Sequence, residues 1–211
     1  MSLVERKIVT LLEVGFGNLP SLSRVINQLG IDTKIAEAAK NILEAEYLII
    51  PGVGSFETAM NFLNEKNYCN VLRERTLELK LPTLGICLGA QIMFNIGYEG
   101  TTTKGLSIFN GTVENLNSKL TMRKSHTGWD KVTFRQNFLG MNEKANVDLF
   151  FNHDYIMIPD NDEDISAVCD YGGEFAVALH KDNCYAVQFH PEKSQESGLR
   201  ILRSFLGLFH V

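Results

Sequence analysis

Three short apolar runs constrain the fold more than any other feature of this sequence. Ile8–Leu12, Tyr47–Ile50 and Thr83–Ile86 are short and almost continuously apolar, which is typical of strands buried on both faces. Glycine follows each run, and residues with helical spacing come next, as with Leu22 and Ile26 after the first run. This alternation predicts an α/β fold, with a mostly parallel sheet, helices on both faces and functional sites at the carboxyl ends of the strands.

The second half of the chain has a different texture. From Gly105 onward the apolar stretches are shorter, alternate with polar residues and are separated by turns, which favours antiparallel strands. Because no linker or internal repeat divides the chain, we expect one domain over residues 1–211, a parallel core with an antiparallel extension. Further strands are expected at Asp32–Ala36, Ser107–Leu116, Lys131–Phe134, Leu149–Ile158, Ile165–Tyr171, Phe175–His180 and Cys184–Phe189, and helices at Phe56–Leu63, Val71–Leu79, Leu88–Ile96 and Leu199–Phe209.

Composition and charge exclude several classes of protein. With 45% apolar and 21% charged residues, the chain has enough apolar surface for a packed core. Twenty basic against 25 acidic residues leave a net charge of −5 without a dense basic block, which disfavours nucleic acid and anionic membranes as partners. The apolar runs fall far short of the roughly 18 residues of a membrane span. Four widely spaced cysteines suggest neither disulfides nor a zinc site, so we expect a cytoplasmic protein.

The first candidate for chemistry is Cys87, between a predicted buried strand and a predicted helix. In Gly85–Gly89, glycine stands two positions to either side of this cysteine, which matches the nucleophile-elbow pattern with cysteine in place of serine. The glycines allow a sharp turn that exposes the sulfur at the top of the sheet, and a helix that begins at Leu88 favours a thiolate. A buried structural cysteine is the alternative.

The second candidate is Gln188–Glu192, at the end of the apolar strand Cys184–Phe189. Pro191 disfavours helical backbone at His190, and in an extended segment His190 and Glu192 project to the same side. A carboxylate at this position would hold the imidazole, which a cysteine nucleophile needs as its general base and acid. Each motif alone also fits a structural role, but together they predict a Cys–His–Glu triad that attacks a carbonyl carbon.

The turn Pro51–Phe56, after a neighbouring buried strand, is a third candidate. Its glycines free backbone N–H groups to point at developing negative charge. The N–H groups around Gly52 and Val53 would then form an oxyanion hole with the N–H of Leu88. The alternative is an ordinary turn into a helix that Ser55 caps.

Taken together, these motifs resemble those of the class I (triad type) glutamine amidotransferases, whose fold is flavodoxin-like. The resemblance depends on Gly85–Gln91 and His190–Glu192 and extends from about Ile8 to Phe205. More narrowly, the chain is similar to the glutaminase subunits of imidazole glycerol phosphate synthase, from histidine biosynthesis. The segments that carry this similarity are Gly15–Asn18, Pro51–Phe56, Lys104–Leu106, His126–Trp129 and His190–Ser194.

The resemblance implies hydrolysis of L-glutamine to glutamate and ammonia, without cofactor or metal. Cys87 would be the nucleophile, His190 the general acid and base, and Glu192 the carboxylate that orients it. Glu99 would suit the α-ammonium group of the substrate, and His153 is at least as well explained as a core residue. Gln91 and Glu99 would recognise the amino-acid end of glutamine. Asn152–Tyr155 is similar to the family segment whose backbone contacts glutamine, so Asp154 and Tyr155 are also implied as glutamine-binding residues.

The resemblance also implies a partner. Free ammonia is largely protonated at neutral pH, and the family passes it directly to a (β/α)₈-barrel cyclase subunit in a heterodimer. Asn18, Trp129 and Lys193 would lie near that interface. As structural alternatives, they would be a turn residue, a core aromatic and a solvated charge.

Departures from the family pattern bear on the ammonia acceptor. The family has Met and Asn where this chain has Thr127 and Asp130, and Asn152–Tyr155 differs from the corresponding Val-His-Ser/Thr-Tyr. Tyr171–Phe175 and Ser194–Gln195 are somewhat similar to glutaminases that feed a barrel partner in bacterial surface-sugar (lipopolysaccharide) biosynthesis, which is the alternative function. A non-catalytic docking subunit and a thiol hydrolase for other γ-glutamyl amides are further alternatives.

Overall fold

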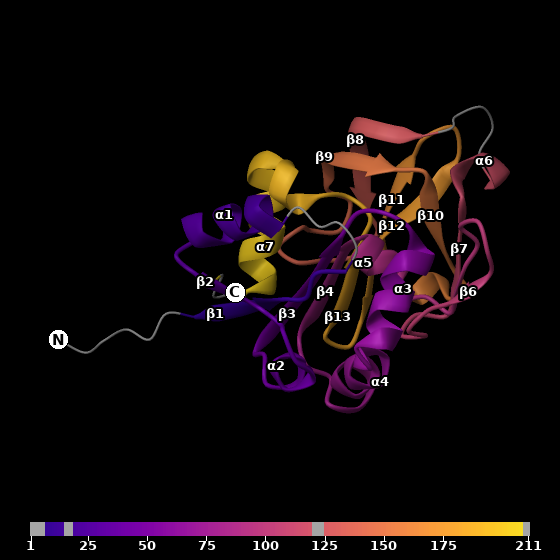
Figure 1. The fold of residues 1–211 in the computed structure, drawn as a ribbon. Coiled ribbons are helices and arrows are strands. Elements are labelled where there is room, and N and C mark those ends of the chain that lie inside the picture. The colour runs from indigo at the N-terminus through magenta and orange to yellow at the C-terminus, as the bar shows by residue number, and fades with distance from the viewer. Residues whose placement is uncertain (1–6, 15–18, 120–124, 209–211) are drawn as a thin grey trace.

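A parallel sheet forms the centre of the computed structural model, which describes residues 7–14, 19–119 and 125–208. Five strands lie side by side and parallel in the order β2-β1-β3-β4-β13 (Figure 1). The buried strands predicted from the three apolar runs are confirmed, as is the parallel core. The bounds are β1 Ile8–Leu11, β2 Asp32–Ile35, β3 Tyr47–Gly52, β4 Thr83–Cys87 and β13 Cys184–Val187.

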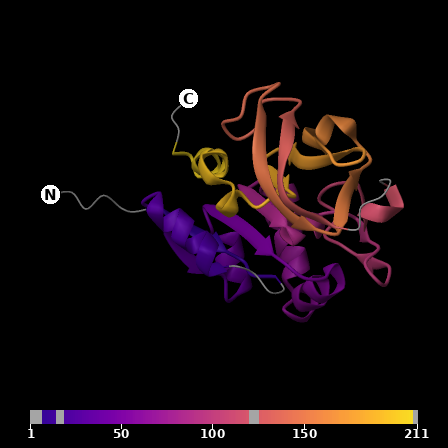
Figure 2. The same ribbon diagram turned by 90° about the horizontal axis from the view of Figure 1, so that it is seen from above.

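Helices cover both faces of this sheet, as the apolar pattern predicts. In β3, Tyr47 and Ile49 pack toward one core cluster, whereas Leu48 and Ile50 belong to the other. The first cluster includes side chains of α1 and α7, and the second includes side chains of α2, α3 and α4, so these helices lie on opposite faces (Figures 1 and 2). Their bounds are α1 Leu19–Gln28, α2 Ala39–Leu43, α3 Phe56–Glu65, α4 Tyr68–Arg73 and α7 Gln195–Phe205.

The predicted antiparallel extension is continuous with the core. Strand β12 (Glu174–Lys181) pairs antiparallel with β13 and also with β10 and β11, so it joins the two parts of one mixed sheet. The remaining strands are β5 Ile96–Gly97, β6 Thr103–Lys104, β7 Gly111–Asn115, β8 His126–Phe134, β9 Asn146–His153, β10 Tyr155–Pro159 and β11 Ile165–Asp170. The short helices are α5 Leu88–Gln91, α6 Leu116–Lys119, a π-helical turn at Glu74–Glu78 and 3₁₀ turns at Asp162–Asp164 and Pro191–Lys193.

Two predicted elements differ from the structure near the candidate nucleophile. The helix expected over Leu88–Ile96 ends at Gln91, because the carbonyls of Ile92 and Met93 accept hydrogen bonds from the following loop. The single strand expected over 149–158 is two strands, since the chain turns at Asp154 and leaves β8 to pair with β7 and β12. Both differences bring loop backbone to the carboxyl ends of the central strands.

Arg75 is the largest fully buried side chain, and its surroundings explain why. Its guanidinium donates to the carbonyls of Ile42, Ala45 and Pro82 and to the hydroxyl of Thr83 at 2.7–3.1 Å. Burial lowers the pKa of Arg75 to about 10, which leaves it charged at neutral pH. One side chain therefore donates hydrogen bonds to backbone carbonyls from α2, its flanking loop and the loop before β4, which lowers the cost of burying these polar groups.

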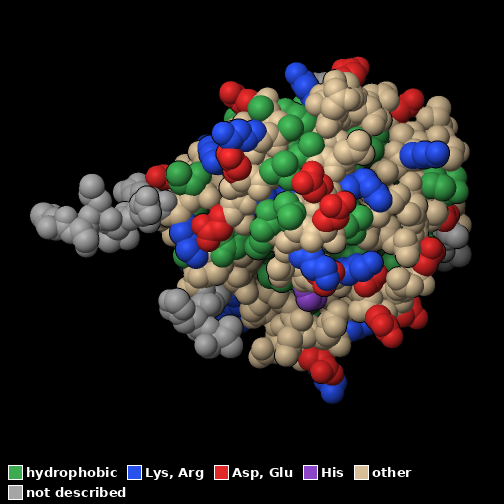
Figure 3. All heavy atoms as spheres, turned by 90° about the horizontal axis from the view of Figure 1, so that it is seen from below, with side chains coloured by type: hydrophobic (Ala, Val, Ile, Leu, Met, Phe, Trp, Pro, Cys, Tyr) green, Lys and Arg blue, Asp and Glu red, His purple; other side chains and the backbone are tan. Residues whose placement is uncertain are grey.

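The surface carries mixed charge. On the face shown in Figure 3, acidic and basic side chains are interspersed rather than gathered by sign. Among the helices of the described ranges, none combines the length and the apolar character that crossing a membrane requires. Mixed charge of this kind favours a protein or small-molecule partner over a polyanion.

Candidate active site

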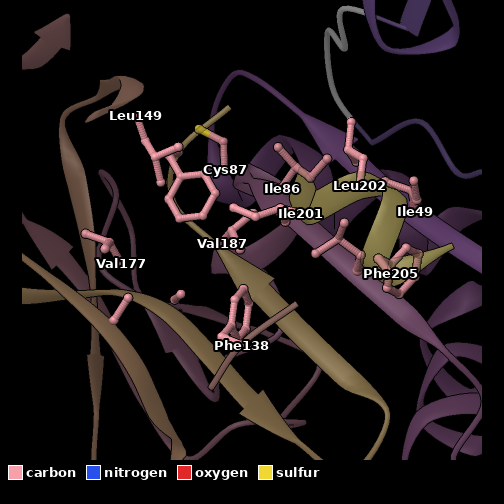
Figure 4. Packing of buried hydrophobic residues seen from close by; sticks show 14 of the residues in the cluster. Ile49, Ile86, Cys87, Phe138, Leu149, Val177, Val187, Ile201, Leu202 and Phe205 are labelled. Atoms are coloured by element: carbon pink, nitrogen blue, oxygen red, sulfur yellow. The ribbon is translucent and has the colours of Figure 1, made fainter. Parts of the chain in front are cut away.

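Strand β4 ends at Cys87 in a strained turn. Cys87 has φ 54° and ψ −110°, a left-handed conformation that costs energy for any residue with a side chain. A Cβ at Gly89 would lie 1.7 Å from the carbonyl oxygen of Ile50, and one at Gly85 would lie 2.6 Å from the carbonyl oxygen of Gly89. The glycines thus let the first turn of α5 approach β3 closely, as the elbow pattern predicts. Cys87 belongs to the core cluster that also holds Ile86, and it lies at the margin of the packed side chains in Figure 4.

His190 reaches the same edge of the sheet because β13 lies next to β4. Val187 pairs with Ile86 in register, so the segment after β13 leaves the sheet beside Cys87. The backbone of His190 is held from β9, where the carbonyl of Phe150 accepts its N–H at 2.8 Å. The hydroxyl of Ser194 donates to the carbonyl of His190 at 2.7 Å, which closes the turn.

Glu192 lies against His190 as the sequence predicts. Nδ1 of His190 is 2.9 Å from Oε1 of Glu192, and both side chains are buried. This bond places the proton on Nδ1 and turns Nε2 toward the nucleophile. Burial opposes the charged imidazole, but the nearby Cys87 and the hydrogen-bonded carboxylate of Glu192 outweigh burial and raise the pKa of His190. Nε2 of His190 has no hydrogen-bond partner among the described residues, so the imidazole is bonded to Glu192 and lies near Cys87 without a bond to its sulfur.

A pocket of about 400 Å³ opens over the sulfur. Its volume is in the range of small-molecule sites. One backbone carbonyl and one side-chain amide approach the nucleophile: the sulfur of Cys87 lies 3.9 Å from the carbonyl oxygen of Asn152 and 3.7 Å from Nε2 of Gln188. The pocket is lined by Val53, Gly54, Ser55, Cys87, Leu88, Gln91, Glu99, Asn152, His153, Asp154 and Tyr155.

All four residues expected to bind glutamine, Gln91, Glu99, Asp154 and Tyr155, line this pocket. Nε2 of Gln91 donates to the carbonyl of Tyr155 at 2.9 Å, and Oε2 of Glu99 accepts the N–H of Phe56 at 2.7 Å. Burial raises the pKa of Glu99, the N–H of Phe56 lowers it, and the nearby charge of Asp154 raises it again. Two carboxylates therefore face one pocket, an arrangement that favours a cationic group such as an α-ammonium.

The residues expected in the oxyanion hole do not all line the same pocket. Val53 and Leu88 line the pocket over the sulfur. Gly52 pairs with Cys87 in the sheet and borders a much smaller cavity shared with His190. Their role in an oxyanion hole stays a prediction. The alternative role of Ser55 is confirmed, because its hydroxyl accepts the N–H of Thr58 and caps α3.

Trp129 and Lys193, two of the residues expected at a partner interface, are not among the residues that line this pocket. Trp129 is 47% exposed, so its alternative role as a core aromatic is wrong. The Trp129 ring packs against the Phe150 ring, with 6.0 Å between centroids, and the ammonium of Lys193 lies 5.3 Å from the centroid of the Phe150 ring. Trp129 also borders a hollow with Asp148 and residues 194–197. Asn18 lies outside the described residues.

Sequence reasoning missed one buried polar cluster beside the pocket. Nδ1 of His126 is 3.0 Å from Nε2 of His153, and Nδ1 of His153 is 2.9 Å from the carbonyl oxygen of Tyr155. His126, Asp130 and Cys169 also place one potential ligand atom each within 4.8 Å of one another. Burial, with the charge of Asp130, raises the pKa of the Cys169 thiol to about 12. The sequence shows the two histidines, but only the pairing of β8 with β9 brings them opposite each other.

The buried His153 makes stability depend on pH. Burial, together with the neighbouring His126, lowers its pKa from 6.5 to about 3. The unfolded chain therefore binds a proton that the folded protein excludes, and the stabilisation is complete above pH 6.5 and decreases as the pH falls toward 3. Relative to His153→Asn, wild type should lose about 2 kcal/mol of unfolding free energy between about pH 7 and about pH 5. Urea denaturation at both pH values measures this difference, and equal losses in the two proteins would contradict it.

Comparison with known proteins agrees with the predicted fold and family. The family model for class I glutamine amidotransferases matches residues 10–207, and the chain belongs to this family. It is 37% identical over 204 residues to imidazole glycerol phosphate synthase subunit HisH 1 of Campylobacter jejuni, covering 95% of this chain and 100% of that protein. The HisH subunit of Leptospira interrogans is 36% identical over 205 residues, with the same coverage.

Two further comparisons extend this result. The Arabidopsis thaliana protein named imidazole glycerol phosphate synthase hisHF, chloroplastic, is 38% identical over 201 residues, which cover 94% of this chain and 34% of that protein. The solved structure of PurLQS from Thermotoga maritima superimposes with a TM-score of 0.73 at 15% identity, covering 96% of this chain and 99% of that chain. At that identity the superposition supports the fold alone, and the predicted flavodoxin-like architecture of the family is confirmed.

Proposed function

We propose that this chain is the glutaminase subunit of an imidazole glycerol phosphate synthase. It hydrolyses L-glutamine to glutamate and delivers ammonia to a (β/α)₈-barrel cyclase subunit in histidine biosynthesis, in the cytoplasm. The observation that carries the proposal is the meeting of Cys87, His190 and Glu192 beneath a pocket that presents Glu99 and Asp154. Identity of 36–37% to HisH subunits over nearly the whole chain supports the same function.

The geometry supports a two-step acyl transfer. The thiolate of Cys87 attacks the side-chain amide carbon of glutamine, and the carbonyl electron pair moves onto the oxygen to form a tetrahedral intermediate. The imidazolium of His190 then protonates the departing nitrogen, which leaves as ammonia while the carbonyl re-forms as a thioester. His190 next removes a proton from water, which attacks the thioester. Breakdown of the second tetrahedral intermediate releases glutamate and regenerates the thiolate of Cys87 and the imidazolium of His190.

Two features support recognition of a free amino acid. Glu99 and Asp154 give one end of the pocket negative charge, which suits an ammonium group. Leu88 and Val53 line the pocket beside the sulfur, where backbone N–H groups would meet the developing oxyanion. We assign the amino-acid end of the substrate to the carboxylates and the scissile amide to the region between Cys87 and Val53.

A barrel partner is part of the proposal. In the Arabidopsis protein, the region similar to this chain accounts for 34% of the length, so the name hisHF covers a further component on the same chain. We assign the partner interface to the exposed surface around Trp129 and Lys193, together with Asn18. The family couples activation to docking, so the isolated chain should hydrolyse glutamine slowly.

Mixing experiments test this function. Purified chain with the cyclase subunit from the same cell should hydrolyse glutamine at least about tenfold faster than the chain alone. Glutamate release measures the rate, and co-purification from the native cell identifies the partner. Full activity without any partner would contradict the coupling, and no hydrolysis of glutamine in the complex would contradict the function.

A surface-sugar pathway is the second candidate for the acceptor. Ser194 and Gln195, which are similar to the corresponding residues of glutaminases of that pathway, border the hollow beside Trp129. Ser194 is buried, whereas Gln195 is exposed and belongs to the proposed docking surface. The glutaminase chemistry would be the same, and only the partner would differ. Co-purification with a sugar-modifying barrel protein in place of a cyclase would favour this candidate.

A further inference from the structure

Two buried histidines link the sheet extension to the glutamine pocket. His126 on β8 lies opposite His153 at the end of β9, and the two side chains are 1% and 7% exposed. Their rings meet through Nδ1 of His126 and Nε2 of His153 at 3.0 Å. His153 also lines the pocket, but its second nitrogen points to the backbone of Tyr155 at 2.9 Å. The proposed mechanism gives neither histidine a role.

The carbonyl of Tyr155 determines which nitrogen carries the proton in each of these hydrogen bonds. A carbonyl oxygen only accepts, so Nδ1 of His153 carries the proton and donates. Because burial keeps His153 neutral, its Nε2 has no proton and accepts. Nδ1 of His126 must therefore be the donor in the bond between the rings. Both hydrogen bonds run in one direction, from β8 toward the pocket.

Tyr155 connects the hydrogen bonds of the two histidines to the substrate pocket. Its carbonyl accepts one hydrogen bond from Nε2 of Gln91 and one from Nδ1 of His153, each at 2.9 Å. Gln91 stands on α5, directly after the nucleophile, and Asn152 at the other end of the turn contacts the sulfur of Cys87. The turn over residues 152–155 thus needs a fixed backbone to line the pocket, and this carbonyl is held from two sides.

We propose that His126 and His153 are positioning residues that hold the turn over residues 152–155, and through it Gln91, in the geometry that binds glutamine. The inference depends on the proposed glutaminase function and extends it to two residues outside the triad. Neither side chain takes part in proton transfer to the substrate. Loss of the hydrogen-bond chain should therefore weaken glutamine binding much more than it slows the chemical step.

Two other roles for His126, aromatic packing and cation binding, predict the opposite ranking of the phenylalanine and asparagine variants. Its ring is stacked between Phe151 and Tyr171, with centroids at 4.3 and 4.0 Å, so it has a packing role as well. Its Nε2 also lies 3.5 Å from Oδ2 of Asp130, near Cys169, where a divalent cation would find three ligands. Phenylalanine keeps the aromatic packing and removes the donor. Asparagine keeps an N–H near the position of Nδ1 but removes both the stacked ring and the possible ligand Nε2.

The experiment compares His126→Phe with His126→Asn in the complex with the barrel partner. We expect H126F to raise KM for glutamine about tenfold, the effect of one lost buried hydrogen bond, with kcat changed less than about threefold. H126N should stay within about threefold of wild type in both constants. Thr133→Val, which removes an exposed hydrogen bond from the same strand to Asn146, is the control and should match wild type.

A second measurement uses Cys87 as a reporter without turnover. A diazo ketone analogue of glutamine should require a higher concentration for half-maximal inactivation of H126F than of wild type. Iodoacetamide, which does not resemble glutamine, should alkylate both proteins at the same rate. If H126F does not fold by circular dichroism, His153→Phe and His153→Asn repeat the comparison, because asparagine keeps a donor for the carbonyl of Tyr155.

The outcomes separate the proposals. H126F equal to wild type in KM, or H126N more impaired than H126F, would overturn the positioning role and favour packing or cation binding. A selective fall in kcat would overturn it too, since it would place the histidines in the chemistry. Wild-type protein that neither hydrolyses glutamine with its partner nor reacts with the diazo ketone would instead contradict the proposed function itself.

Discussion

Replacing Cys87 with alanine is expected to abolish glutamine hydrolysis, with a fall of at least about 10⁴-fold in kcat. Among the described residues that line the pocket, Cys87 has the only thiol, which the thioester requires. The remaining rate would come from binding and electrostatic stabilisation alone, and a water molecule would have to attack an unactivated amide. Glutamate release by the variant in the presence of the barrel partner measures the loss.

Controls for this variant come from the chain itself. Removal of a strained cysteine at φ 54° is not expected to unfold the protein, because alanine is smaller and fits the same backbone. Cys69→Ala removes a half-buried thiol whose hydrogen bond goes to Asn64, far from the pocket, and should leave the rate unchanged. C87A should still bind glutamine and the partner. Undiminished turnover by C87A would refute the assignment of the nucleophile.

The parallel core could be predicted because its signal is local. Each buried strand is a short apolar run, and apolar residues of the two faces alternate along it, as with Leu48 and Ile49 in β3. The triad could also be predicted, because its two segments each end a strand of that core. Parallel neighbours bring their carboxyl ends to one edge, so Cys87 and His190 come close although they are 103 positions apart in the sequence (190 − 87).

Other features depend on contacts that no local pattern encodes. Val71–Leu79 reads as an amphipathic segment, yet it contains Arg75, whose burial follows from carbonyls that only the fold brings around it. The helix after Cys87 ends early because the carbonyls of Ile92 and Met93, just beyond it, accept hydrogen bonds from the loop at residues 106–109. The pairing of His126 with His153 depends on the register between β8 and β9. Propensity is a weak guide where tertiary hydrogen bonds decide the structure.

The exposure of Trp129 is another feature that depends on strand register rather than on a local sequence pattern. Trp129 stands in a strand whose inward positions hold His126 and Val132, and large aromatic residues are more often buried than exposed. In the register of β8, however, Trp129 points to the opposite side, where it is 47% exposed. An exposed tryptophan beside Lys193 is a feature of binding surfaces, and the sequence shows it only once the register is known.

Replacing Glu192 with glutamine is expected to lower kcat by about 10³- to 10⁴-fold while leaving the fold intact. The carboxylate accepts the proton of Nδ1 of His190 at 2.9 Å, and this keeps Nε2 available to the sulfur of Cys87. A glutamine amide that turns its N–H₂ toward the ring would make Nδ1 the acceptor and place the proton on Nε2. His190 would then be in the wrong tautomer to accept a proton.

The pH profile distinguishes this effect from simple damage. In wild type, burial disfavours the imidazolium of His190, but Cys87 and Glu192 together raise its pKa above the usual value. The active thiolate–imidazolium pair is therefore lost only as the pH rises through this raised pKa. Without the charge of Glu192 the pKa of His190 falls, so the alkaline limb of kcat/KM for E192Q should move to lower pH. Glu196→Gln, which removes an exposed carboxylate paired with Arg203, is the matched control and should keep the wild-type profile. An alkaline limb that does not move in E192Q would show that Glu192 does not act through His190.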